Sequence, residues 1–168
     1  LGILAGAGFT AVIQSSSASV GILQALANSG VIGLSSAVFV LFGQNIGTCI
    51  TAVLASIGTS RSAKRATIIH LMFNVIGTVI FTFLFILFPI AHVIDGQIPV
   101  AGLSGILPST PAGQIALVHT SFNIVTTLLL LPLGNYLAKA AVRILPDRPG
   151  DEVDQMHLEY LTPIQISS

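Results

Sequence analysis

The sequence predicts an all-α, polytopic membrane protein, and three observations lead to that fold class. Of the 168 residues, 53% are hydrophobic and 7% are charged, whereas a soluble domain carries about 25% charged residues. The mean hydropathy is +0.93. No Asp, Glu, Lys or Arg occurs in residues 1–60, 66–94 or 96–138, and such stretches are typical of membrane segments rather than of a soluble core. The formal net charge of zero argues against nucleic acid as a partner.

Four apolar units are expected along the chain, followed by a polar tail. The units are residues 1–28, 33–58, 66–93 and 113–138. Polar residues interrupt the first two units, whereas the third has few helix breakers before Pro89. The tail, residues 146–168, holds five of the six acidic residues and is expected to be a solvated cytoplasmic linker.

The first unit has two possible paths through the bilayer. It is either one full crossing or a hairpin that reaches the midplane and returns. Residues 2–13 would span about 18 Å as a helix, which is roughly half of a 30 Å hydrocarbon core. In the hairpin interpretation, the polar residues at 14–17 lie at the tip, near the middle of the membrane.

Basic residues give the orientation of the second half. They form two clusters, one between units two and three and one after unit four: Arg61, Lys64 and Arg65, then Lys139, Arg143 and Arg148. Short loops rich in Lys and Arg stay cytoplasmic. Two crossings separate the clusters, so both can be cytoplasmic and the loop 92–112 is expected outside.

The polar stretch QSSS is the first candidate binding site. It consists of Gln14, Ser15, Ser16 and Ser17, and Ser19, which follows closely, is a candidate to line the pathway. Each hydroxyl can donate one hydrogen bond and accept two. A helix starting just after the stretch would direct free N–H groups at it, and helix N-termini favour anions. We therefore expect an oxyanion site made of neutral donors; close helix packing is the alternative role for these serines.

The second polar stretch, GQNIGT at residues 43–48, is a candidate ion site. Its glycines permit unusual backbone angles and close approach, and Asn45 and Thr48 add side-chain oxygens. Broken helices of secondary transporters hold coupling ions with unwound carbonyl groups. No Lys or Arg lies inside any unit, and an unpaired charge at mid-membrane costs at least about 2.5–3.5 kcal/mol. The hypothesis is that an anion travels together with sodium.

Two histidine segments share the pattern H-x-x-F-N. They are HLMFNVIGT at 70–78 and HTSFNIVTT at 119–127. Positions i, i+3 and i+4 lie on one helix face, so His70 with Asn74 and His119 with Asn123 either line a polar path or bond to neighbouring helices. The second interpretation is favoured. No metal site beyond sodium is expected, because no carboxylate or thiol accompanies the histidines.

The segments QSSSAS, GQNIGTCITA and SAKRATIIHLMFNVIG, in this order, resemble the type II sodium-dependent phosphate cotransporter family in its bacterial branch. The resemblance extends from about residue 6 to residue 146. It implies two inverted repeats per carrier, each with QSSS in a re-entrant hairpin and G-x-N-I-G-T in a broken helix. This chain is similar to the C-terminal repeat, so residues 1–145 would form one membrane transport repeat. The implied substrate- and sodium-binding residues are Gln14, Ser15, Ser16, Ser17, Asn45, Gly47 and Thr48.

The chain departs from the family pattern in two ways. Gln44 and Cys49 stand where the family commonly has Ala or Ser, and Thr or Ser. Only one QSSS is present, so the chain would hold half of a site. The missing first repeat or a second copy of the chain would complete it.

The expected function is sodium-coupled import of inorganic phosphate across the inner or plasma membrane by alternating access. No catalysis and no cofactor are expected, apart from sodium as coupling ion; the partners are phosphate, sodium and the lipid bilayer. The alternatives are a carrier of another oxyanion, such as sulfate, and a non-transporting assembly or signalling subunit. An intramembrane serine hydrolase is disfavoured, because the three serines are not distinguished from one another and no G-x-S-x-G is present.

Overall fold

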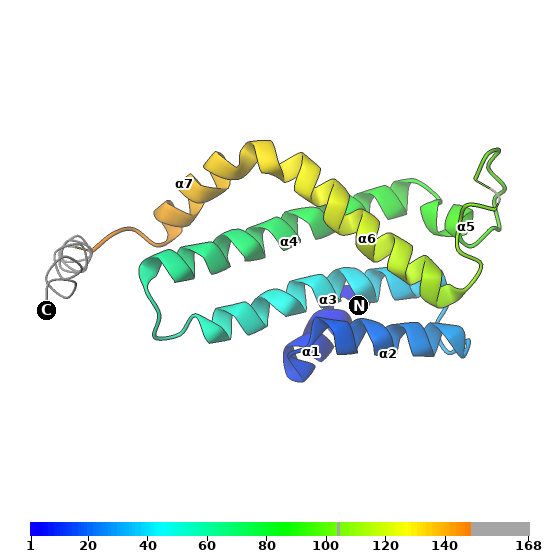
Figure 1. Cartoon of the computed structure of the whole chain (residues 1–168), viewed down its shortest axis with the longest axis horizontal. Helices are drawn as coiled ribbons and strands as arrows, with labels where there is room; N and C mark the ends of the chain where they lie inside the picture. The colour runs from blue at the N-terminus through cyan, green and yellow to red at the C-terminus, as the bar shows by residue number, and fades with distance from the viewer. Residues whose placement is uncertain (104, 149–168) are drawn as a thin grey trace, which may run out of the picture.

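The computed structural model describes residues 1–103 and 105–148, and this part of the chain is helical with no β-strand (Figure 1). The fold class expected from the sequence is therefore confirmed. In chain order the elements are α1 Gly2–Ile13, α2 Ser16–Asn28, α3 Leu34–Ala55, α4 Arg61–Leu87, α5 Ile90–Ile94, α6 Pro111–Leu130, the 3-10 helix η1 Leu131–Leu133 and α7 Gly134–Ile144. Residues 149–168, most of the predicted tail, lie outside the described residues.

Within the part of the chain that the structure describes, three helical stretches are long and apolar enough to cross a bilayer: Leu34–Ala55, Arg61–Leu87 and Pro111–Ile144. The protein is thus a multi-pass membrane protein. Figure 1 shows α3 and α4 running along the long axis of the molecule. We call the end with the turn 56–60 and residues 144–148 the basic end. The end with the turn 29–33 and the segment 88–110 is the loop end.

Helix α1 packs directly against α3, and glycines make the contact possible. A Cβ on Gly6 would overlap the carbonyl oxygen of Val40, and one on Gly43 would overlap that of Ile3. Gly2 and Gly6 on α1, and Gly43 and Gly47 on α3, each have G-x-x-x-G spacing, which lets helix backbones approach closely.

The predicted interruption of the second unit is not present. Helix α3 runs without a break from Leu34 to Ala55, so residues 43–48 are helical. The physical reason lies in the two glycines: both face the backbone of α1, where a side chain would not fit. Gly43 and Gly47 were expected to permit either unusual backbone angles or a close helix contact. They permit the close contact with α1, and their backbone is helical.

Helix α2 returns alongside α3 to the loop end, where it is tied to the start of α6. The Asn28 side-chain oxygen accepts a hydrogen bond of 3.0 Å from the N–H of Ala112. The Gln24 amide donates to the carbonyl oxygen of Ala112 at 3.1 Å. Both ends of the α1–α2 pair thus lie on the loop-end half of α3, since Gly2 packs against Phe39 near the start of α3.

An aromatic cluster forms the core between α3, α4 and α6. The ring of Phe42 lies 5.9 Å from Phe81, 5.5 Å from Phe85 and 5.6 Å from Phe122, measured between centroids. Phe42 and Phe122 are fully buried. Gly77 on α4 lets this contact form, because a Cβ there would lie 2.9 Å from the Phe122 ring.

The third and fourth helical units have other bounds than the apolar runs 66–93 and 113–138 suggested. Helix α4 starts at Arg61, because the Ser60 hydroxyl caps it by accepting from the N–H of Ala63 at 3.3 Å. The last unit changes direction at residues 131–133, where Pro132 interrupts the α-helical hydrogen bonds. Figure 1 shows α7 turning back toward the beginning of α4.

Candidate functional site

The polar turn between α1 and α2 lies beside the middle of α3. A Cβ on Gly47 would lie 2.5 Å from the carbonyl oxygen of Ala7 and 2.8 Å from the Cβ of Thr10. The Gln44 amide donates to the carbonyl oxygen of Ser19 at 2.9 Å. The two polar stretches that the sequence singled out therefore meet, and Figure 1 shows the turn near the middle of the long axis.

Gln14 and Ser15 make the turn. Gln14 has φ 56° and ψ 25°, and within the described residues it is the only non-glycine residue with positive φ. This left-handed conformation is uncommon for residues other than glycine, and such conformations concentrate at functional sites. The hydroxyl of Ser15 then caps α2 by accepting from the N–H of Ala18 at 3.3 Å. The side chain of Gln14 is exposed.

Ser16 and Ser17 open α2 and present donors at its positive end. Their backbone N–H groups belong to the first turn, which has no intrahelical acceptor. Ser16 is half-buried and Ser17 is exposed. Two N–H groups and two hydroxyls are thus gathered at a helix N-terminus, an arrangement that favours an anion.

Three buried polar oxygens beside this turn lack a hydrogen-bond partner within the described residues. They are Thr10 Oγ1, Ser19 Oγ and Gln44 Oε1, and Asn45 Nδ2, next to Gln44 in the sequence, also lacks one. Thr10 and Ser19 are fully buried, and Gln44 and Asn45 are 2% and 7% exposed. Buried polar groups are nearly always paired, so these atoms are candidates to contact a bound ion or water.

Thr48 forms a hydrogen bond within α3, and Gly47 packs against α1. The Thr48 hydroxyl donates to the carbonyl oxygen of Gln44, one turn earlier, at 2.9 Å. Gly47 is buried against α1. Of the two, Gly47 lies at the α1–α3 contact, and Thr48 lies one helical turn after Gln44.

The histidine segments lie on α4 and α6 and not at the polar turn. The Asn74 amide donates to the carbonyl oxygen of His70 at 3.0 Å, and that of Asn123 to the carbonyl oxygen of His119 at 2.8 Å. Asn74 is buried and Asn123 is exposed. Both amides thus bond within their own helix, while the first segment also contacts α3, where Cys49 Sγ donates to the carbonyl oxygen of His70 at 3.6 Å.

Thr10 and Gln44 are the residues that sequence reasoning did not assign to the site. Thr10 is the only hydroxyl in α1, one turn before Gln14, and that isolation in an apolar helix was the available signal. Gln44 was noted only as a departure from a family pattern. Ser19, predicted to line a pathway, lies at the site through its contact with Gln44.

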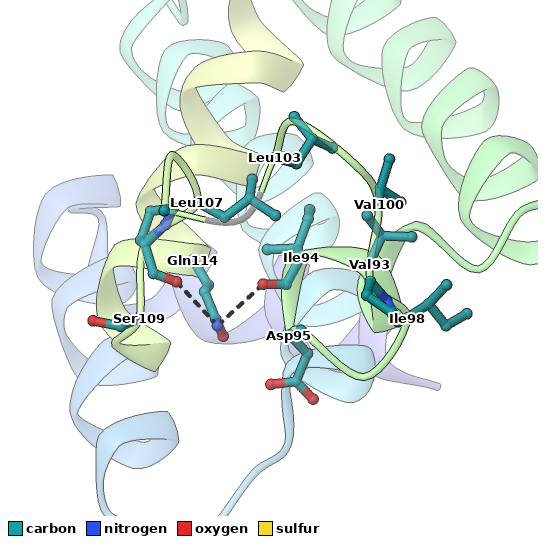
Figure 2. Close-up of a pocket in the computed structure, with 13 residues that line it drawn as sticks. Val93, Ile94, Asp95, Ile98, Val100, Leu103, Leu107, Ser109 and Gln114 are labelled. Atoms are coloured by element: carbon teal, nitrogen blue, oxygen red, sulfur yellow. Dashed lines mark hydrogen bonds between the residues drawn. The ribbon is translucent and has the colours of Figure 1, made fainter.

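A separate cavity of about 380 Å³ lies under the segment 93–109 at the loop end. Its lining is mostly apolar, with Asp95 as the one charged residue among those that line it. Figure 2 shows the Gln114 amide pointing between two segments of the loop. Its Nε2 donates there to the carbonyl oxygens of Ile94 and Pro108, both at 3.2 Å. This cavity lacks the convergent polar groups of the turn between α1 and α2.

Comparison with known proteins agrees with these motifs. The profile of the Na+/Pi-cotransporter family matches residues 1–96. YqeW of Bacillus subtilis, an uncharacterized protein, is 38% identical over 144 residues, which are 86% of this chain and 43% of YqeW. The human sodium-dependent phosphate transport protein 2C is 42% identical over 81 residues, 46% of this chain and 14% of that protein.

YjbB of Salmonella typhimurium, provisionally named an inorganic phosphate export protein, is 27% identical over 89% of this chain and 25% of its own length. No solved structure matches the chain. The chain spans less than half the length of each of these relatives. Because the family profile covers more than half of the 168 residues, the chain belongs to the Na+/Pi-cotransporter family.

Proposed function

We propose that this chain is the second-repeat half of a carrier that moves inorganic phosphate across the inner or plasma membrane together with sodium. The observation that carries the proposal is the meeting of the serine turn 14–17 with the buried polar residues of α3. Family membership supports phosphate and sodium as the transported species. The names of the human and Salmonella relatives both refer to phosphate.

The anion would bind at the start of α2. Ser16 and Ser17 offer backbone N–H groups and hydroxyls there, and the helix dipole adds a partial positive charge. These donors carry no net charge. They can bind phosphate without the permanent positive charge of a Lys or Arg side chain, which would hold the anion in place. The same donors suit any tetrahedral oxyanion, and a sulfate carrier is the alternative that the test must separate.

Sodium would bind beside the anion, on oxygen atoms. Thr10 Oγ1, Ser19 Oγ and Gln44 Oε1 have no partner in the described residues, and a hard cation takes oxygen ligands. No Lys or Arg lies between Leu1 and Ser60, so a bound cation is the available countercharge for an anion at mid-membrane. This arrangement makes phosphate binding depend on sodium.

A matching half is needed to close the site. Gln14 and Ser17 are exposed on this chain, although the turn between α1 and α2 that holds them lies near the middle of the bundle (Figure 1). Polar groups facing lipid at that depth are costly. The first repeat or a second copy of the chain would cover them. Alternating access of the site between the two halves would complete the transport cycle, with the loop end outside and the basic end in the cytoplasm.

The test is uptake of labelled phosphate into proteoliposomes that hold the full-length parent protein. Sodium is compared with potassium, and labelled sulfate serves as the competing oxyanion. The variant is Ser16→Ala, and the matched control is Ser35→Ala, which changes an exposed serine at the loop-end start of α3. Phosphate uptake that needs sodium and falls only in Ser16→Ala supports the proposal.

Uptake of sulfate in place of phosphate would move the assignment to another oxyanion. Absence of uptake in both cations, with normal folding, would favour a non-transporting subunit. Efflux from preloaded vesicles, measured beside uptake, decides between import and the export function in the name of the Salmonella relative.

A further inference from the structure

Helix α7 extends the last membrane unit beyond the length that a bilayer requires. The stretch Pro111–Ile144 has 34 residues and would measure about 51 Å as one straight helix, whereas the hydrocarbon core is about 30 Å thick. Helix α6 alone, with 20 residues, covers about 30 Å. The chain then changes direction at Pro132, and α7 begins at Gly134. Helix α7 is therefore expected at the membrane surface, at the basic end of the bundle.

The contacts of α7 agree with this position. Helix α7 packs against α4 (Figure 1), and Ala141 is its one fully buried residue. Directly after α7, the carbonyl oxygen of Leu145 accepts hydrogen bonds from the guanidinium of Arg65 at 2.9 and 2.8 Å. Charged side chains are costly inside the hydrocarbon core. The end of α7 thus lies at the level where α4 carries its charged residues.

Two cationic side chains lie on the face of α7 that points away from α4. Lys139 and Arg143 come two positions before and two positions after the buried Ala141. In a helix with 3.6 residues per turn, both positions lie almost opposite to Ala141. Both side chains are exposed. Lys139 lies 6.0 Å from the centre of the Tyr136 ring, a contact that leaves its charge unchanged.

No carboxylate of the described residues compensates these two cations. Asp95 and Asp147 are the acidic residues within 1–103 and 105–148. Asp147 forms an ion pair of 2.7 Å with Arg65. Asp95 lies at the loop end, where it accepts a hydrogen bond of 2.6 Å from the amide of Gln97. The outer face of α7 therefore presents two positive charges to the membrane surface.

A surface groove of about 500 Å³ combines these cations with apolar side chains of the same helix. The residues that line it are Tyr136, Lys139, Ala140, Arg143 and Ile144. Tyr136 is 70% exposed and Ile144 is 62% exposed. Tyrosine is enriched where membrane and water meet, because its ring is apolar and its hydroxyl is polar. A ligand that fits this groove has an anionic head for the cations and an apolar part for Tyr136 and Ile144.

We propose that the groove on the outer face of α7 binds the phosphate headgroup of an anionic phospholipid. Each Lys or Arg near the surface adds attraction to anionic lipids, and the apolar stems of both side chains can lie along the lipid while their charges reach the headgroup. A small anion such as inorganic phosphate would match the cations and leave the apolar side of the groove uncovered. The inference is independent of the proposed transport site, because no lining residue belongs to α1, α2 or α3.

The test is the binding of radiolabelled phosphatidylglycerol to the delipidated full-length parent protein, immobilised in detergent. The variants are Lys139→Gln, Arg143→Gln and the double variant. The matched control is Lys64→Gln, which removes the same charge from α4 at the same end of the bundle, outside the groove. Lys139→Arg keeps the charge, and thermal unfolding of every variant reports whether the fold is retained.

We expect the affinity for phosphatidylglycerol to fall about fivefold in each single variant and at least about tenfold in the double variant. Lys64→Gln should change it less than about twofold, because a charge outside the groove acts only through the screened surface field. Lys139→Arg should bind like the unaltered protein. An equal loss in Lys64→Gln would mean diffuse surface attraction and would overturn the site. Unchanged affinity in the double variant would overturn it as well.

A second arm identifies the ligand. Labelled phosphatidylcholine, which has a phosphate but no net charge, is compared with phosphatidylglycerol, and inorganic phosphate at millimolar concentration is added as competitor. Weaker binding of phosphatidylcholine and retention of phosphatidylglycerol support the proposal. Equal binding of the two lipids would overturn the choice of an anionic headgroup. Displacement by inorganic phosphate would identify the free anion as the ligand and would overturn the choice of a phospholipid.

Discussion

The side-chain amide of Gln44 donates a 2.9 Å hydrogen bond to the backbone carbonyl oxygen of Ser19. Both residues are buried, at 2% and 0% exposed. This bond joins the first turns of α2 to the middle of α3, where the two polar stretches of the sequence meet. The Oε1 of Gln44 and the Oγ of Ser19 have no hydrogen-bond partner within the described residues.

Replacing Gln44 tests this bond. Gln44→Leu removes the side-chain donor from the buried Ser19 carbonyl oxygen, and one intramolecular hydrogen bond contributes about 0.5–1.5 kcal/mol. We expect a lower melting temperature of the purified full-length protein and loss of phosphate uptake. Gln24→Leu, which breaks a bond at the half-buried loop end, is the control and should keep uptake. Loss of uptake in both variants would show that uptake depends on any contact of α2, and not on the bond between Gln44 and Ser19 in particular.

Thr10 gives a readout that separates ion binding from folding. Thr10→Val removes a buried hydroxyl without a partner and keeps the side-chain shape. Folding stability should stay equal or rise, since an unpaired buried hydroxyl is costly. The sodium concentration for half-maximal uptake should rise about two- to tenfold, as expected for one lost interaction of ~0.5–1.5 kcal/mol.

The control for Thr10 is Thr67→Val, because the Thr67 hydroxyl already donates to the Ala63 carbonyl oxygen at 3.1 Å near the basic end. It should leave the sodium dependence as it is. An unchanged sodium dependence in Thr10→Val would remove Thr10 from the proposed site.

The glycine contact between α1 and α3 predicts a strong effect of one methyl group. In Gly43→Ala the new Cβ would overlap the carbonyl of Ile3, and overpacking typically costs about 1–3 kcal/mol. Gly134→Ala is the matched control, since nothing lies within 4 Å of a Cβ there. Thermal unfolding should show a clear decrease only for Gly43→Ala. Equal melting temperatures would mean that the two helices are not in contact at this position.

Gln114 is expected to hold the loop segments that cover the cavity at the loop end in place (Figure 2). Gln114→Ala removes both hydrogen bonds, to Ile94 and Pro108. Amide hydrogen exchange in residues 93–100 and 106–110 should accelerate, while α3 keeps its protection. If exchange in these residues stays as slow as in the unaltered protein, the loop is held by its apolar contacts instead.

The sequence was sufficient to predict the all-α class. Apolar stretches without charges that are long enough to cross a bilayer are typical of transmembrane helices. It also marked residues 14–17 as an interruption of the first unit but left a full crossing and a hairpin open, and the structure has the turn at Gln14 and Ser15. The continuity of α3 was not predictable from residues 43–48 alone. Glycine is compatible with a broken helix and with a close helix contact, and only the partner backbone of α1 decides between them.

The candidate site shows the same division between local and long-range information. The serine cluster was visible as a motif, whereas Thr10 carries no motif and enters the site only because α1 lies against Gly47. The two H-x-x-F-N segments show that a repeated pattern does not specify a shared environment. Asn74 is buried and Asn123 is exposed, because α4 and α6 turn different faces to the bundle.

The central claim is that the serine turn reaches mid-membrane and faces the transported anion. It is tested by thiol labelling of Ser17→Cys in a Cys49→Ser background of the full-length carrier, with and without sodium and phosphate. Ser35→Cys at the loop-end start of α3 is the control for accessibility. The account predicts labelling of Ser17→Cys that sodium plus phosphate slows severalfold, while the control is unaffected. Labelling that is indifferent to phosphate and sodium would contradict the placement of the anion at the start of α2.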